Sequence, residues 1–199
     1  MGDVSHMAEW QRMLTESKFC KKIIYMKFLN NSQDVPWKKL FFGNAARPRA
    51  IFTLWMVCLG RISTKTRLMK FGILDNNNCV MCTGDEDLNH LFFLCERTKS
   101  IWQEVLNWLQ VEHGTGGWDY ELKWMIHRCN QKGWKSILLK TALAETVHAC
   151  WLYRNSFVFK DDDKDRNRHR RIAKEIIDRI VQRIWNKPKL RGKIAPFLL

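Results

Sequence analysis

The chain has 199 residues, of which 46% are hydrophobic, and it contains 10 tryptophans and 11 phenylalanines. This composition is that of a globular protein and excludes a disordered chain. The formal net charge of +14 favours a polyanionic partner, and no apolar run reaches the ~18 residues of a membrane span. We therefore expect neither membrane association nor a small-molecule substrate.

Helical spacing dominates the chain, and no alternating pattern is long enough for a convincing strand. We interpret residues 1–7 as a cloning remnant, and apolar spacing predicts a helix over residues 8–29. A short basic segment follows over residues 37–42. The next helix is predicted over residues 47–59, since Pro48 suits a first helical turn.

Ser63 is predicted to cap a short basic helix that ends at Gly72. Further helices are predicted over residues 98–109, 120–129, 134–158 and 166–185. The last has an apolar stripe on one side and arginines on the other, which makes it an amphipathic basic C-terminal helix. The expected fold class is mostly α. We expect a helical zinc-knuckle domain over residues 8–110 and a helical region over 111–199 packed on it.

The densest cluster of metal-binding residue types is Cys79-x2-Cys82, followed by His90 and Cys95. Thiolates and an imidazole at this spacing are typical of a tetrahedral zinc site. Four protein ligands leave no open position, so we expect one structural zinc ion and no metal-activated water. Asp87 is placed to cap a short helix that carries His90.

Two pairs, His127 with Cys129 and His148 with Cys150, suggest a second metal site. Each pair lies in a predicted helix, where positions two apart point to different faces, so we do not favour it. The sequence has no glycine-rich phosphate loop and no assignable catalytic set. We therefore predict that the protein is not an enzyme.

Positive charge gathers in two regions that flank an acidic centre. Residues 36–70 hold eight Lys or Arg and no acid, whereas residues 76–130 hold four against eight acids. Basic regions of this density usually bind polyanions. The candidate nucleic-acid contacts are Lys38, Lys39, Arg47, Arg49, Arg61, Lys65, Arg67, Lys70, Arg168 and Arg171. Trp37 or Phe41 can stack on unpaired bases if exposed.

The motifs resemble a known family, the zinc-binding domain associated with reverse transcriptase (zf-RVT) of plant LINE-type (non-LTR) retrotransposons. The resemblance covers Phe19 to Trp102 and is continued by Trp151-Leu-Tyr-Arg154-Asn155. The matching residues are Trp37, Pro48, Phe52, Trp55, Arg61, Ile62, Thr64, Leu68, Cys79, Cys82, Glu86, His90, Leu91, Phe92, Phe93, Cys95 and Trp102. No polymerase, endonuclease or RNase H acidic set accompanies them.

The resemblance implies binding of the element's RNA or of its DNA target, with RNA favoured over DNA. A protein-interaction adaptor is the alternative, in which residues 166–186 dock into a partner's groove or form a homodimer. The Lys187–Lys193 string resembles a nuclear import signal. We therefore favour the nucleus over the cytoplasm.

Overall fold

The computed structural model describes residues 35–130, 133–159 and 168–195. The chain divides into two units, residues 1–35 and 36–199, and the description below is of the second. The interpreted cloning remnant and the predicted helix over residues 8–29 lie outside the described residues. The predicted boundary near residue 110 stays a prediction.

Helices make up almost all of the described secondary structure, as predicted. In chain order they are η1 (Pro36–Leu40), α3 (Pro48–Cys58), α4 (Lys65–Lys70), η2 (His90–Leu94), α5 (Glu96–Trp108), α6 (Trp118–Arg128), α7 (Trp134–Phe159), α8 (Arg168–Trp185) and α9 (Pro188–Ile194). Within the described ranges, β pairing is confined to one isolated bridge between Asn78 and Asp85. The helix bounds follow the predicted ranges closely, except for α9, which was not predicted.

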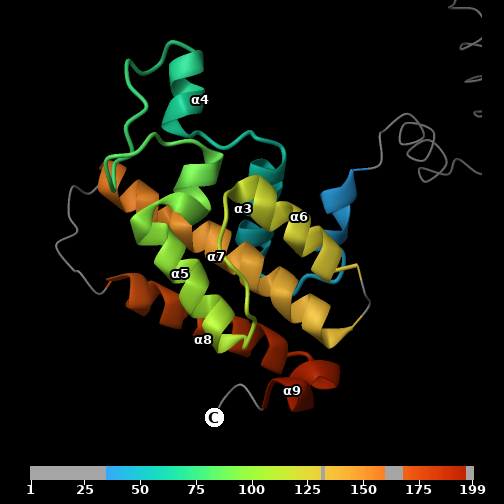
Figure 1. The fold of residues 1–199 in the computed structure, drawn as a ribbon. Helices are drawn as coiled ribbons and strands as arrows, with labels where there is room; N and C mark the ends of the chain where they lie inside the picture. Colours follow the sequence, from blue (N-terminus) through green and yellow to red (C-terminus); the bar gives the residue numbers. More distant parts are fainter. Residues whose placement is uncertain (1–34, 131–132, 160–167, 196–199) are drawn as a thin grey trace, which may run out of the picture. The chain divides into compact units, whose positions relative to one another are not determined.

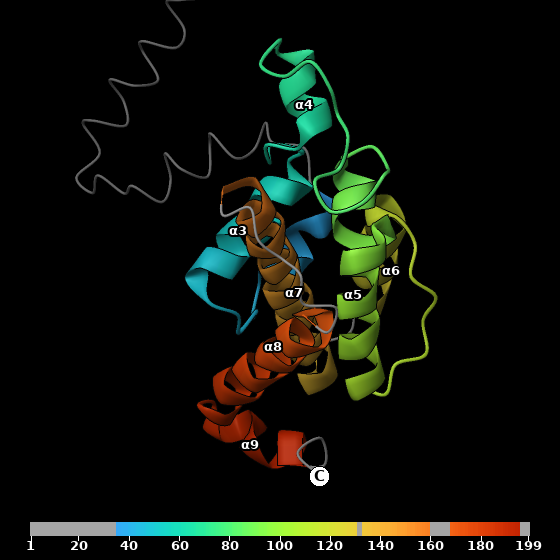
Figure 2. The same ribbon diagram turned by 90° about the vertical axis from the view of Figure 1, so that its left-hand side faces the viewer.

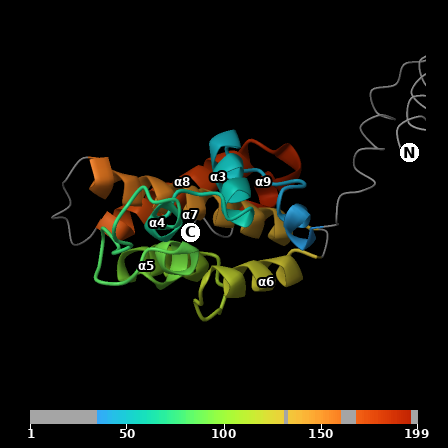
Figure 3. The same ribbon diagram turned by 90° about the horizontal axis from the view of Figure 1, so that it is seen from above.

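The long helix α7 is the centre of the fold. It is apolar around most of its circumference, a pattern that indicates enclosure by other helices. Helices α3, α5 and α8 pack against it, and in the view from above α5 and α6 follow one another along one flank while α3 lies on the other (Figure 3). Leu143, Val147 and Cys150 of α7 are completely buried.

Helix α8 confirms the predicted amphipathic pattern. Its buried residues are Ala173, Ile176, Ile180 and Ile184, and the helix packs on both α5 and α7. The apolar stripe is therefore part of the core of this molecule. No helix within the described ranges is long and apolar enough to cross a membrane.

Helix α4 differs from the others because it stands apart from the helical body (Figures 1 and 2), and none of its residues is buried. Its N-cap is Thr64, whose hydroxyl accepts a hydrogen bond from the Arg67 N–H at 3.3 Å. The prediction of Ser63 as the cap was wrong by one residue, since the helix begins at Lys65. Gly72 follows the helix with a φ of 68°, which favours glycine.

Candidate metal centre

Cys79, Cys82, His90 and Cys95 come together as predicted, and their ligand atoms all lie within 4.8 Å of one another. The Cys82 and Cys95 sulfurs are 3.7 Å apart. Two sulfurs bound to one tetrahedral zinc ion, each at about 2.3 Å, are separated by about 3.8 Å. The Cys82 sulfur lies 3.0 Å from His90 Nε2. The donor set and its spacing therefore fit one zinc ion.

The first two ligands lie in a tight turn that directs backbone N–H groups at the sulfurs. The Met81 N–H donates to Cys79 Sγ at 3.4 Å, and the Gly84 N–H donates to Cys82 Sγ at 3.5 Å. The Cys79 N–H donates to the Gly84 carbonyl at 2.7 Å and closes the turn. These donors stabilise negative charge on the sulfurs, which is the form that binds metal.

The other two ligands are joined by a wide helical turn. The Asp87 carboxylate accepts the His90 N–H at 2.7 Å, so Asp87 caps this turn as predicted. The Cys95 N–H donates to the His90 carbonyl at 2.7 Å, an i to i+5 bond of the π-helical type. Between them, Phe92 and Phe93 are completely buried and contact the Trp118 ring, at centroid distances of 6.1 Å each. The metal site is thereby attached to the core.

Gly84 lies directly against the His90 imidazole. A Cβ at this position would meet His90 Cε1 at 2.7 Å, closer than side-chain carbons normally come. The glycine is required here by the close approach of the ligand ring. It is a functional residue that the spacing of the four ligands does not reveal.

The Cys79 and Cys95 thiols shift each other's pKa through a hydrogen bond. A hydrogen bond from the Cys95 thiol is the largest cause that lowers the pKa of Cys79 to about 4, and the same contact raises the pKa of Cys95. Cysteine binds zinc as the thiolate, so zinc binding at this cluster is expected to release protons.

A buried ion pair connects the knuckle to α7 and α4. The Arg154 guanidinium binds both oxygens of Glu86, at distances from 2.6 to 3.1 Å, and the two side chains are 6% and 0% exposed. Glu86 Oε1 also accepts the Lys65 N–H at 3.0 Å, and the Glu86 carbonyl accepts the Thr66 N–H at 3.1 Å. Glu86 therefore holds the start of α4 against the end of α7.

Sequence reasoning named Glu86 and Arg154 only as parts of a resemblance and missed their contact. A signal was present, because a lone arginine in a long apolar helix requires a buried partner. What the sequence did not show was which acid supplies it.

The predicted nucleic-acid contacts are distributed over several elements. Arg47 forms a structural ion pair with the fully buried Glu145 at 2.7 Å, and Arg168 lies over the Tyr153 ring at 5.1 Å. Lys39 donates to Asn130 at 2.6 Å. Arg49, Arg61, Lys70 and Arg171 are exposed, Lys38 is exposed on η1, and Lys65 and Arg67 are partly exposed on α4.

The aromatic residues suggested for stacking are not the exposed ones. Trp37 and Phe41 are half-buried, pack against the core and contact each other edge to face at 5.6 Å. Phe71, directly after α4, is 63% exposed and lies beneath the Arg67 guanidinium at 4.9 Å. Phe71 is therefore the better stacking candidate.

The alternative second metal site does not form within the described residues, where the Cys79 cluster is the one group of this kind. His148 Nδ1 lies 2.9 Å from the Thr53 hydroxyl. Cys150 is completely buried, and this burial raises the pKa of its thiol to about 12. Both residues belong to the helical core.

Fold and site together define a helical protein with a structural Cys3His zinc site. The family described as zinc-binding in reverse transcriptase (zf-RVT) matches residues 19–102, so this segment is similar to that zinc-binding domain. The resemblance drawn from the motifs is confirmed at this level, and the family is defined by metal binding, not by catalysis. The comparisons with curated proteins and with solved structures found no match.

Proposed function

We propose that the protein is a zinc-stabilised nucleic-acid-binding module derived from the reverse-transcriptase protein of a plant LINE-type retrotransposon. Cys79, Cys82, His90 and Cys95 hold one structural zinc ion. Cations on and around α4 bind the phosphates of RNA in preference to DNA. The zinc ion has a structural and not a catalytic role, because all four of its positions are filled by protein ligands, and we propose no enzymatic activity for the chain.

Helix α4 carries the proposal. It has three cations within six residues, none of its residues is buried, and no acidic residue lies in its first turn. A helix with no buried residue contributes little to the core, yet this one is fixed by Thr64 and by the buried carboxylate of Glu86. Such a rigid, protruding basic helix is suited to contact a polyanion.

The test is fluorescence-anisotropy binding to single-stranded RNA, an RNA hairpin and a DNA duplex over a salt series. We expect binding to weaken steeply with salt, at about 0.7 log units per log unit of salt for each phosphate contacted on a single strand. The triple variant Lys65→Ala, Arg67→Ala, Lys70→Ala is expected to lower that slope by about 2.

The matched control removes three exposed cations from α5 and α6 by changing Lys99, Lys123 and Arg128 to alanine. It has the same net charge as the α4 variant, so it separates a local contact from a general charge effect. Equal weakening by both triple variants contradicts the role of α4, and salt-insensitive binding by the unchanged protein contradicts the function itself.

The adaptor alternative has less support. It requires the apolar stripe of α8 to be open to a partner, but Ile176, Ile180 and Ile184 are buried against α5 and α7. Nuclear residence is supported by the exposed cations of α9, namely Lys189, Arg191 and Lys193. Changing these three to alanine in a fluorescent fusion is expected to reduce nuclear accumulation.

A further inference from the structure

We propose that the pocket between α4 and the zinc knuckle binds one unpaired nucleotide of a single-stranded nucleic acid. The α4 wall binds the phosphate, and the opposite wall accepts hydrogen bonds from the base or sugar. The inference rests on the proposed function and specifies which feature of the strand is recognised.

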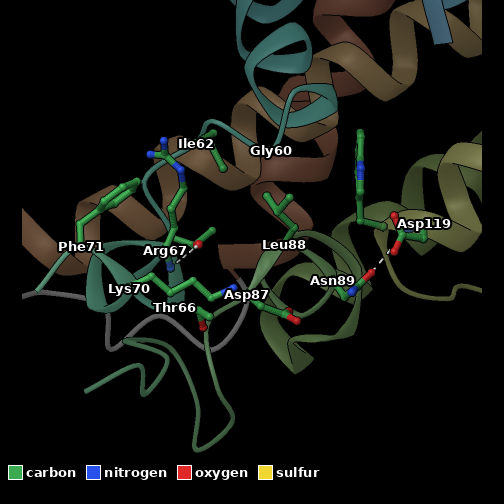
Figure 4. A pocket seen from close by; sticks show the side chains of 12 residues that line it. Gly60, Ile62, Thr66, Arg67, Lys70, Phe71, Asp87, Leu88, Asn89 and Asp119 are labelled. Atoms are coloured by element: carbon green, nitrogen blue, oxygen red, sulfur yellow. Dashed lines mark hydrogen bonds between the residues drawn. The ribbon is translucent and has the colours of Figure 1, made fainter. Parts of the chain in front are cut away.

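The pocket has a volume of about 440 Å³ and is lined by residues of α4, the knuckle and the start of α6. This volume lies within the range of about 300–1,000 Å³ that is usual for small-ligand sites. Figure 4 shows Arg67, Lys70 and Phe71 on one side and Asp87, Asn89 and Asp119 on the other.

The α4 wall combines positive charge with an exposed aromatic ring. The Arg67 guanidinium lies over the Phe71 ring, 4.9 Å from its centroid, and both side chains line the pocket. Lys70 adds a second charge on the same helix. Single-strand binding usually combines two contacts: a base stacks on an aromatic ring, and a protein cation binds the neighbouring phosphate.

The opposite wall is acidic, which determines the kind of strand that fits. Asp87 and Asp119 both carry acceptor oxygens. The Asp87 carboxylate accepts the His90 N–H, and the Asp119 N–H donates to Asn89 Oδ1 at 3.3 Å, which links the start of α6 to the knuckle. Carboxylates repel phosphates but accept hydrogen bonds from base N–H groups and from the ribose 2′-OH. In a duplex the Watson–Crick N–H groups are already paired, so the acidic wall favours an unpaired nucleotide.

Thr66 adds an unused polar group to the lining. Its hydroxyl oxygen is buried and makes no hydrogen bond. Buried hydroxyls are nearly always paired in folded proteins. The unpaired Thr66 hydroxyl is therefore a second indication that this pocket takes a polar ligand.

The experiment compares one labelled single-stranded RNA with the same RNA annealed to its complement. The variant Phe71→Ala removes an exposed ring, so folding is expected to be retained, and zinc content and circular dichroism check this. Loss of one stacked base costs about 1–3 kcal/mol, so single-strand affinity is expected to fall about 5- to 160-fold while duplex affinity changes little. Phe42→Ala is the matched control, because Phe42 is 73% exposed and does not line the pocket.

A second variant, Asp119→Asn, tests the acidic wall without changing its shape. We expect it to reduce the preference for single-stranded over double-stranded RNA. If the unchanged protein binds no nucleic acid in a salt-dependent way, the proposed function fails. If it binds through α4 but Phe71→Ala and Asp119→Asn both behave like the unchanged protein, the pocket inference is overturned and the proposed function stands.

Discussion

Helices α7 and α4 represent two regions of this molecule that are stabilised by different means. Helix α7 is enclosed by α3, α5 and α8, and sixteen of its residues are buried, whereas α4 has none. The helical body is thus stabilised by apolar burial, at about 25 cal/mol for each Å² removed from water. Helix α4 is positioned by polar links to the knuckle, chiefly those of Glu86. The difference predicts that the two regions respond separately to metal loss and to core mutation.

The largest expected effect follows removal of zinc by a chelator or by Cys82→Ser. Structural zinc sites contribute about 10–16 kcal/mol of folding free energy in isolated zinc fingers. We expect α4 and residues 79–95 to lose amide protection in hydrogen exchange, while α7 and α8 keep it. Cys58→Ser is the control, since Cys58 is outside the cluster. This variant is expected to bind the same amount of zinc as the unchanged protein. Equal loss of protection along the whole chain would falsify the separation of the two regions.

The next largest effect is expected from Arg154→Met, which leaves the buried Glu86 carboxylate without its partner. Removing one member of a buried ion pair costs about 3–5 kcal/mol, measured by urea unfolding of the zinc-saturated protein. We also expect faster exchange in α4, because Glu86 holds its first turn. Arg179→Met is the control: its pair with Glu175 is 32% and 51% exposed, so it should cost less than about 1 kcal/mol. Equal destabilisation by both variants would contradict the role of the buried pair.

A variant in the helical core tests whether damage to the body also affects the metal centre. Ile180 of α8 is completely buried, so Ile180→Ala is expected to cost about 2–5 kcal/mol through lost burial and the cavity that remains. Zinc affinity, measured by competition with a chelating dye, should be unchanged. A parallel fall in zinc affinity would show that the body and the knuckle are one cooperative unit.

Gly84→Ala should affect the metal centre alone. The added Cβ displaces the His90 ring, which it would otherwise meet at 2.7 Å. Disturbing the support of a ligand typically lowers metal affinity about 10- to 100-fold. Gly114→Ala is the matched control, because a Cβ there has nothing within 4 Å. Normal zinc affinity in the Gly84 variant would contradict this account.

The smallest expected effect is a pH dependence inside the body. Burial, followed by the charge of Arg47, lowers the pKa of His148 below its ordinary value of 6.5. As the pH falls, His148 is protonated at a higher pH in the unfolded chain than in the folded protein. Its contribution to the free energy of unfolding is therefore complete above pH 6.5 and is lost as the pH falls towards the pKa of the folded state. We expect His148→Gln to reduce this loss, measured as the difference in urea midpoints between the two zinc-saturated proteins. Identical pH profiles of the two proteins would show that His148 does not cause this loss of stability.

The sequence by itself determined most of the helices and the grouping of the four metal ligands. Residues 98–109 and 166–185 are recognisable because their apolar residues repeat at the helical period, and residues 134–158 because their apolar run is too long for a strand. The ligands are recognisable because all four lie within residues 79–95, where local spacing alone brings them together. The cap of α4 was misplaced by one residue, since Ser63 and Thr64 are both good capping residues and only the position of Glu86 separates them.

Only the tertiary structure decided which charged residues are structural and which face outward. Arg154 meets Glu86 across 68 positions of the chain, and Arg47 meets Glu145 across 98. No local pattern encodes such pairs, because their partners are chosen by the packing of α3, α4 and the knuckle on α7. The protrusion of α4 and the exposure of Phe71 have the same origin. A short basic helix has the same sequence pattern whether it is packed or isolated, and burial depends on what the rest of the chain places beside it.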